Sequence, residues 1–337
     1  MLNKKIKTAY KLFKHTPKNL SSISNFINSV KYNTLPSNLK QTQVNHKPIS
    51  ISIYINTICN YRCKFCFLIN EDHIGTKKKN ISIEQFNKII NHKNNIGVSR
   101  VTLGGGEPLL HKNFFDFVNI LNENNKIISV YTNGSLINRN FEQMAKAKID
   151  YINISHYDEH FFTIKDHIKE LKNKNKYAKV RISKIISNED YKKMEELIEE
   201  SIALNLDRVI FQNYFPYREN EIKLTIYDDN KKYQEYVKYL KNKFLNKIEI
   251  VWPSILQRNG KFNCQNISLT ATYDADGFIS PCCFIVPPEE KFGNLDDYNF
   301  WNNNMFKSLR SQYGSKKKLG NSCDNCYFKH GLSNRYL

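Results

Sequence analysis

Long apolar runs are absent from this 337-residue chain, and so is an N-terminal apolar segment ending in a small-residue cleavage site. The first absence excludes a membrane-spanning helix of ordinary length, and the second argues against a secretory signal peptide. The chain also has no internal repeat and no extended low-complexity segment. Its eight cysteines are therefore better explained as metal ligands than as a disulfide framework, and we expect a reducing, cytoplasmic compartment.

Acidic residues are absent from the first 70 positions, where 11 Lys and Arg contribute +11 of the formal net charge of +19. The other 40 basic and 32 acidic residues contribute only +8, so the sequence predicts no nucleic-acid partner. Residues 1–48 are predicted to form a basic tail. Its lysines between residues 4 and 18 alternate with apolar side chains. They could form a short amphipathic helix that contacts an anionic membrane surface weakly, or a solvated tail.

From residue 50 onward, predicted strands alternate with predicted helices. The strands cover 51–55, 100–103, 127–132, 151–155, 179–186 and 208–212. The helices follow at 82–92, from 113, and at 139–147, 160–171 and 189–204. This alternation predicts an α/β fold with a parallel sheet, and six units fit a partial (βα)6 TIM-like barrel over residues 49–215. A helical connector is expected at 216–262. In such folds the chemistry lies at the carboxyl ends of the strands.

Three cysteines follow the first predicted strand closely, at Cys59, Cys63 and Cys66. Three thiolates can hold three irons of a [4Fe–4S] cube and leave the fourth iron open to a small molecule. The C-x3-C-x2-C spacing, with Phe65 before the last cysteine, resembles the signature of the radical S-adenosylmethionine (SAM) enzymes. The alternative is a structural zinc site with His73 as fourth ligand, because zinc sites normally have four protein ligands.

A glycine-rich turn, Gly105-Gly106-Glu107-Pro108, ends the second predicted strand. It matches the GGEP segment that contacts the methionyl amine of SAM in the family, and Phe65 also belongs to the family's SAM site. The resemblance places further SAM contacts at the ends of later strands. These are Asn133, Ser155 and Arg181, with adenine expected near Phe211, Gln212 and Asn213. Each has an ordinary alternative: Asn133-Gly134 is a common turn, Ser155 can bond local backbone, and Arg181 can point outward.

A second cysteine group lies in residues 263–337, in the pattern Cys264-x12-Gly277-x4-Cys282 followed by Cys323-x2-Cys326. The first part predicts a β-hairpin in a small cysteine-rich C-terminal domain, with Gly277 supplying a positive φ. The pattern resembles the SPASM/twitch extension of radical SAM enzymes, whose cysteines bind auxiliary [4Fe–4S] clusters. No cysteine follows Cys326, so the single-cluster twitch form is expected. A zinc-ribbon site is the alternative. Cys283, expected to be a small buried hydrophobe, could replace Cys282 as ligand.

The resemblance implies a complete chemistry. An electron donor such as flavodoxin or ferredoxin reduces the first cluster, SAM is cleaved to a 5′-deoxyadenosyl radical, and that radical abstracts hydrogen from a substrate carbon. The auxiliary cluster then accepts an electron, giving a net oxidation. The favoured substrate is a carbohydrate-type small molecule, followed by a peptide or protein side chain and then RNA. The hypothesis from another class is a non-catalytic iron–sulfur or zinc scaffold.

Overall fold

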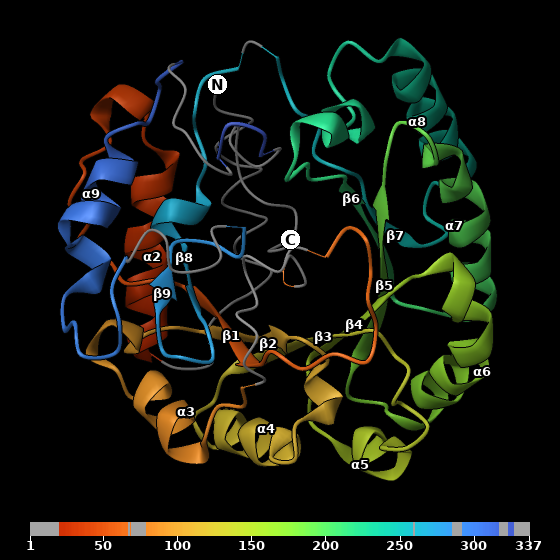
Figure 1. The fold of residues 1–337 in the computed structure, drawn as a ribbon, viewed down its shortest axis with the longest axis horizontal. Helices are drawn as coiled ribbons and strands as arrows, with labels where there is room; N and C mark the ends of the chain where they lie inside the picture. The colour runs from red at the N-terminus through yellow and green to blue at the C-terminus, as the bar shows by residue number, and fades with distance from the viewer. Residues whose placement is uncertain are drawn as a thin grey trace. The chain divides into compact units, whose positions relative to one another are not determined.

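The computed structural model describes residues 20–66, 68, 79–258, 260–284, 292–316 and 323–326. The described residues within 1–129 and 261–324 form one compact unit, called unit 1 here. Those within 130–260 and 325–327 form a second, called unit 2. Each unit is built from a mainly parallel sheet and the helices that cover it (Figure 1).

The sheet of unit 1 has the order β9-β8-β1-β2, and the first residues of β3 follow β2. Its strands are β1 (Ser50–Asn56), β2 (Arg100–Gly105), β3 (Ile127–Thr132), β8 (Thr270–Tyr273) and β9 (Ile279–Ser280). β1 pairs in parallel with both β2 and β8, so that Ser52 lies opposite Thr102 and Thr272. The predicted C-terminal hairpin is present as β8 and β9, and β8 pairs with β1 in the same sheet.

The helices of unit 1 come from distant parts of the chain. They are α2 (Leu20–Thr34), α3 (Ile83–Ile90), α4 (Phe114–Glu123) and α9 (Asn304–Arg310), with 3-10 helices η1 (Ser37–Leu39), η2 (Lys93–Asn95), η3 (Pro108–Leu110), η6 (Asn266–Ser268) and η7 (Phe300–Asn302). Ser82 begins α3 with the predicted capping box, because its hydroxyl accepts from the Gln85 N–H while the Gln85 side chain accepts from the Ser82 N–H.

Alternation along the strands gives the sheet of unit 1 one apolar and one polar face. Ile53, Leu103 and Tyr273 are fully buried on the apolar face, where the Tyr273 hydroxyl pairs with the Asn95 amide at 2.8 Å. The opposite face carries serine and threonine side chains and ends in Tyr54 and the buried Asn56. The cysteine loop that follows β1 thus begins at the polar face of the sheet.

Unit 2 contains the remaining residues of β3. Its strands have the order β3-β4-β5-β6-β7. Its strands β4 (Tyr151–Ser155), β5 (Lys179–Ile186), β6 (Arg208–Asn213) and β7 (Glu249–Val251) pair in parallel. Helices alternate with them: α5 (Phe141–Lys146), α6 (Asp158–Lys174), α7 (Met194–Ala203) and α8 (Lys231–Lys243), with 3-10 helices η4 (Tyr191–Lys193) and η5 (Glu219–Leu224). The predicted α/β alternation with a parallel sheet is confirmed.

Two predicted boundaries differ from the structure. The segment 216–262, predicted as a helical connector, contains η5 and α8 but also β7, a seventh parallel strand. Residues 20–48, predicted as part of a tail, are packed: Phe26 is buried, and the Asn25 amide donates to the Pro48 carbonyl at 3.1 Å. The lysines at 4–18 lie outside the described residues. Within the described part of the chain, no helix combines the length and apolar character needed to cross a membrane.

Candidate functional site

The loop that follows β1 carries Cys59, Cys63 and Cys66, and all three thiols are half-buried. The Cys66 N–H donates to the Cys63 carbonyl at 3.0 Å, and the Tyr61 N–H donates to the Cys59 Sγ at 3.4 Å. Phe65 lies half-buried in the turn between the last two cysteines. The loop therefore holds three soft sulfur ligands close together in sequence, at the strand end where the barrel prediction expects chemistry. His73 lies outside the described residues.

Asn56, which the sequence analysis missed, joins the glycine-rich turn to this loop. Its side-chain oxygen accepts from the Gly106 N–H at 3.1 Å, and its amide donates to the Glu107 carbonyl at 2.9 Å. The Glu107 N–H in turn donates to the Ile58 carbonyl at 2.8 Å. The only sequence signal was a polar residue that ends an otherwise mainly apolar strand just before the cysteine motif. The two motifs predicted to share one ligand are thus held together by direct hydrogen bonds.

Glu107 is buried at 1% exposure, and its Oε1 accepts from the Leu109 N–H at 3.0 Å, which begins η3. A buried carboxylate is costly unless it is hydrogen-bonded or meets a cation. The predicted partner for Glu107 is the methionyl ammonium group of SAM. The backbone of the turn is thus fixed by the same side chain that supplies the charge.

Glu107→Gln is expected to weaken SAM binding about tenfold or more, because a charge-assisted hydrogen bond contributes roughly 1.5–3 kcal/mol. Glutamine keeps an oxygen for the Leu109 N–H, so the turn is retained while the charge is lost. Anaerobic equilibrium binding of SAM to the reconstituted protein measures the effect. The matched control is Glu84→Gln, because Glu84 is exposed on α3 and pairs with Lys88 across one helical turn. Equal SAM affinity of Glu107→Gln and the control would contradict the assignment.

Three further predicted SAM contacts belong to unit 2. Asn133 is buried, and its Oδ1 accepts from the Ser135 N–H at 3.0 Å and hydroxyl at 2.6 Å, so it shapes the turn after β3. Ser155 is half-buried at the end of β4 and lies opposite Ser183 of β5. The Arg181 guanidinium stacks 3.6 Å from the centre of the Tyr151 ring. Their roles toward SAM remain predictions.

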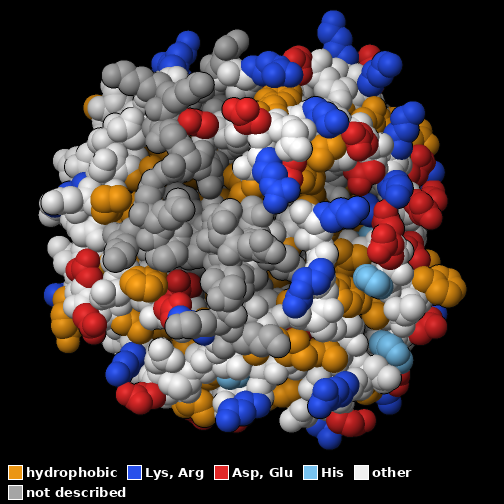
Figure 2. Space-filling view, viewed as in Figure 1, with side chains coloured by type: hydrophobic (Ala, Val, Ile, Leu, Met, Phe, Trp, Pro, Cys, Tyr) orange, Lys and Arg blue, Asp and Glu red, His pale blue; other side chains and the backbone are white. Residues whose placement is uncertain are grey.

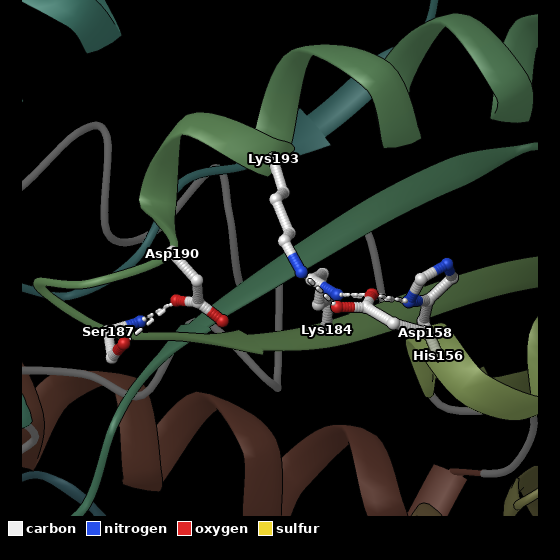
Figure 3. A network of polar contacts seen from close by, with 6 residues as sticks. All are labelled: His156, Asp158, Lys184, Ser187, Asp190 and Lys193. Atoms are coloured by element: carbon white, nitrogen blue, oxygen red, sulfur yellow. Dashed lines mark hydrogen bonds and ion pairs between the residues drawn. The ribbon is translucent and has the colours of Figure 1, made fainter.

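A polar network directly follows Ser155 and fixes the chain between β4 and α6 (Figure 3). The buried Lys184 donates to the His156 Nδ1 at 3.2 Å and pairs with Asp158, which also pairs with Lys193 at 2.7 Å. Burial, followed by the Lys184 charge, lowers the pKa of His156 to about 4. Burial alone would raise the pKa of Asp158, but hydrogen bonds from Lys184 and Lys193 outweigh it and lower that pKa to about 2. The network therefore combines a neutral imidazole with a charged carboxylate and anchors the end of β4.

The second cysteine group is mostly buried, and four of its thiols belong to unit 1. Burial raises the pKa of the Cys282 thiol well above its usual value, and neighbouring Cys283, Cys323 and Cys264 raise it further. The other three thiols therefore lie within electrostatic range of Cys282. Cys326 is also buried, three residues after Cys323. Gly277 adopts the predicted positive φ, 82°, in the turn between β8 and β9.

Among the described residues, no group of three or more His, Cys, Asp or Glu side chains is placed to hold a single metal ion. The donor set, three thiols in one loop and a second buried group of thiols, fits iron–sulfur ligation in its chemistry.

Comparison with protein families gives two matches. The model of the radical SAM superfamily matches residues 53–225, about half of the chain. The chain belongs to the radical SAM superfamily. Residues 264–327 match SPASM, an iron–sulfur cluster-binding domain. Membership implies a SAM-binding [4Fe–4S] cluster and SAM itself, and the SPASM match implies auxiliary iron–sulfur ligation, as predicted. Membership of the superfamily also supports the prediction that the chain is an enzyme. The single-cluster twitch form stays a prediction.

Curated relatives match only part of this radical SAM chain. A GTP 3′,8-cyclase of Cronobacter sakazakii is 31% identical over 108 residues, which is 31% of this chain and 33% of the relative. A probable GTP 3′,8-cyclase of Thermoplasma volcanium is 35% identical over 108 residues, 32% of each chain. The chain thus covers about a third of the length of these relatives.

Solved radical SAM structures match nearly the whole chain. Streptococcus suis SuiB bound to S-adenosylmethionine has a TM-score of 0.63 at 20% identity. The match covers 93% of this chain and 78% of the SuiB chain. Native anSMEcpe with bound AdoMet and Cp18Cys peptide has a TM-score of 0.61 at 17% identity, over 84% and 88%. At these identities the likeness concerns the fold, and it confirms the partial-barrel architecture with a cysteine-rich C-terminal region.

Several basic side chains of unit 2 pair with acidic ones. On α8, Lys243 pairs with Glu195 at 2.6 Å and with Glu199 at 2.7 Å. Arg258 pairs with Asp229 at 2.6 Å. On the face drawn in Figure 2, Lys and Arg alternate with Asp and Glu over α6, α7 and α8, and do not form a continuous basic stripe.

Proposed function

We propose that the chain cleaves SAM reductively and abstracts a hydrogen atom from a carbon of a peptide or protein side chain. The observation that carries the SAM chemistry is the joining of the three-cysteine loop to the Gly105-Gly106-Glu107 turn by Asn56. A peptide substrate is supported by the likeness to SuiB, which has been seen bound to its precursor peptide SuiA, and to anSMEcpe with its bound peptide. Those likenesses extend over 93% and 84% of this chain.

The chain's own residues divide the work as follows. Cys59, Cys63 and Cys66 hold the first cluster, and Glu107 receives the SAM ammonium group. Gly105 and Gly106 let backbone approach SAM, and Phe65 lies in the cluster loop. Asn133, Ser155 and Arg181 are proposed to bind the rest of SAM. When bound, the cluster and SAM together supply the 5′-deoxyadenosyl radical, so the protein's task is to orient the substrate and exclude water.

Cys264, Cys282, Cys323 and Cys326 are proposed to hold one auxiliary cluster, which accepts an electron from the substrate and makes the reaction a net oxidation. Four thiolates saturate a cube, so this site favours electron transfer over substrate binding. Replacing Cys323 and Cys326 by alanine is then expected to abolish product while 5′-deoxyadenosine still forms. Product formation at the wild-type rate would contradict the electron-transfer role. Flavodoxin or ferredoxin is proposed as the electron donor to the first cluster.

Oxidation of a carbohydrate-type small molecule is the second candidate. It follows from the single-cluster twitch form predicted for residues 263–337, where four cysteines fit the pattern and Cys283 is the only other. Single-cluster members of the family that the sequence resembles include enzymes that oxidise a sugar alcohol. The proposed barrel, 49–215, and the proposed auxiliary region, 263–337, are common to both candidates.

Deuterium transfer distinguishes the two substrate classes. The reconstituted protein is incubated with SAM and dithionite, and with either a tryptic digest of perdeuterated bacterial protein or a set of perdeuterated hexoses. Deuterium in 5′-deoxyadenosine with the digest alone supports the peptide proposal. Deuterium with the hexoses alone assigns the carbohydrate class. Failure to form any 5′-deoxyadenosine from SAM would overturn the radical function itself.

A further inference from the structure

The segment from Tyr32 to His46 crosses the loop that carries Cys264, and both belong to unit 1. The Ser37 hydroxyl hydrogen-bonds to the Asn263 side chain, one residue before the cysteine. The Asn33 side chain accepts from the Ser268 hydroxyl at 2.7 Å, on the other side of the cysteine. α9 fastens the same segment, since the Arg310 guanidinium donates to the Thr42 carbonyl at 3.3 Å. The segment predicted as tail is thus a structural cover of the auxiliary cysteine loop.

Lys40 is the charged residue of this cover. Its ammonium group lies 4.3 Å from the centre of the Tyr313 ring and 5.5 Å from that of Tyr32, within cation–π range of both. Tyr313 is itself held by a 3.0 Å hydrogen bond between its hydroxyl and that of Ser268, and its ring packs 6.2 Å from that of Phe262. Two aromatic rings and the Cys264 loop therefore fix the position of a half-buried cation.

Lys40 lies beside the loop that carries Cys264. Hydrogen bonds that involve Ser37 and Asn33 hold its segment to Asn263 and Ser268, which flank the cysteine in the sequence. Tyr313, whose ring Lys40 contacts, bonds to the same Ser268. The charge of Lys40 is therefore held next to the auxiliary cysteine loop within unit 1.

We propose that Lys40 raises the reduction potential of the auxiliary cluster held by Cys264. The proposal rests on the proposed function, because it requires a cluster at that cysteine. A cube bound by four thiolates carries a net negative charge that becomes more negative on reduction. A nearby positive charge therefore stabilises the reduced form more than the oxidised form. Because Lys40 is half-buried, salt screens this interaction less than it would screen a surface pair. In this proposal Lys40 is a tuning residue that acts through the charge of the cluster.

The test is the midpoint potential of the auxiliary cluster in the full-length chain. Cys59, Cys63 and Cys66 are replaced together by alanine, so that only the auxiliary cluster titrates with redox mediators and is followed by optical and paramagnetic resonance spectra. Lys40→Met is expected to shift the midpoint to a more negative potential, whereas Lys40→Arg restores it toward the wild-type value. The control is Lys31→Met, because Lys31 is exposed in the last turn of α2 and is expected to leave the potential unchanged.

A merely structural role for Lys40 would change iron content or thermal stability without moving the potential. Equal midpoints for Lys40→Met and Lys31→Met would overturn the proposal. If Lys40→Met binds no iron, Lys40→Gln is titrated in its place. If both neutral variants lose iron while Lys40→Arg keeps the wild-type potential, the role of Lys40 is structural and the proposal is overturned. An auxiliary site that binds zinc instead of iron would overturn it too. In each case 5′-deoxyadenosine formation by the chain with Cys59, Cys63 and Cys66 intact tests the proposed function separately.

Discussion

Cys63→Ala is expected to reduce 5′-deoxyadenosine formation to background and to remove about four of about eight irons per chain. Cys63 lies between the other two cysteines of the loop, and two remaining thiolates cannot hold three corners of a cube. Its backbone carbonyl also accepts the Cys66 N–H at 3.0 Å, and alanine keeps that bond. The loss therefore reports the missing sulfur and not a collapsed turn. Iron and labile sulfide per chain, with 5′-deoxyadenosine measured by chromatography, check the expectation.

The matched control is Cys283→Ala, which removes a buried thiol that the cluster assignment does not use. It is expected to keep both the iron content and SAM cleavage. If Cys283→Ala lost four irons, Cys283 would replace Cys282 as the auxiliary ligand. SAM cleavage by Cys63→Ala at the wild-type rate would remove the first cluster from its assigned loop.

Gly106→Ala is expected to destabilise the chain by about 1–3 kcal/mol, as overpacking typically does, and to weaken SAM binding. A Cβ at position 106 would lie 2.0 Å from the Ile58 carbonyl oxygen and 2.4 Å from its carbon. These are backbone atoms of the cysteine loop, so the loop itself must move. The same displacement would break the bonds from Asn56 to the turn. Thermal unfolding and iron content after anaerobic reconstitution measure the effect.

Gly104→Ala provides the comparison two residues earlier, in β2. Among the described residues, a Cβ at position 104 would meet the Tyr54 ring alone, at an ordinary contact distance of 3.8 Å. Its unfolding temperature and iron content are expected to stay near those of the unsubstituted chain. Equal stability of the two alanine variants would mean that the turn and the cysteine loop are not in the close contact described here.

Much of the barrel could be predicted from local sequence because its strands are short, apolar and bounded by turn residues. The ranges 127–132, 151–155 and 179–186 agree with β3, β4 and β5. The capping box at Ser82 and the positive φ at Gly277 are also local properties, set by residues within one turn. The local sequence did not predict β7, because a strand of three residues is too short to show a pattern and is defined by its pairing with β6.

What the sequence alone determined is the chemistry: the cysteine spacing, the glycine-rich turn and the donor atoms that they supply. These depend on residue types a few positions apart, which the sequence states directly. Only the tertiary structure decided which distant segments meet. It pairs β8 with β1, lets Asn56 bind the glycine-rich turn, and packs the segment around Lys40 against the loop of Cys264. Each of these contacts joins residues about 50 to more than 200 positions apart, and such pairings depend on the burial and hydrogen bonding of the whole fold, which no local pattern encodes.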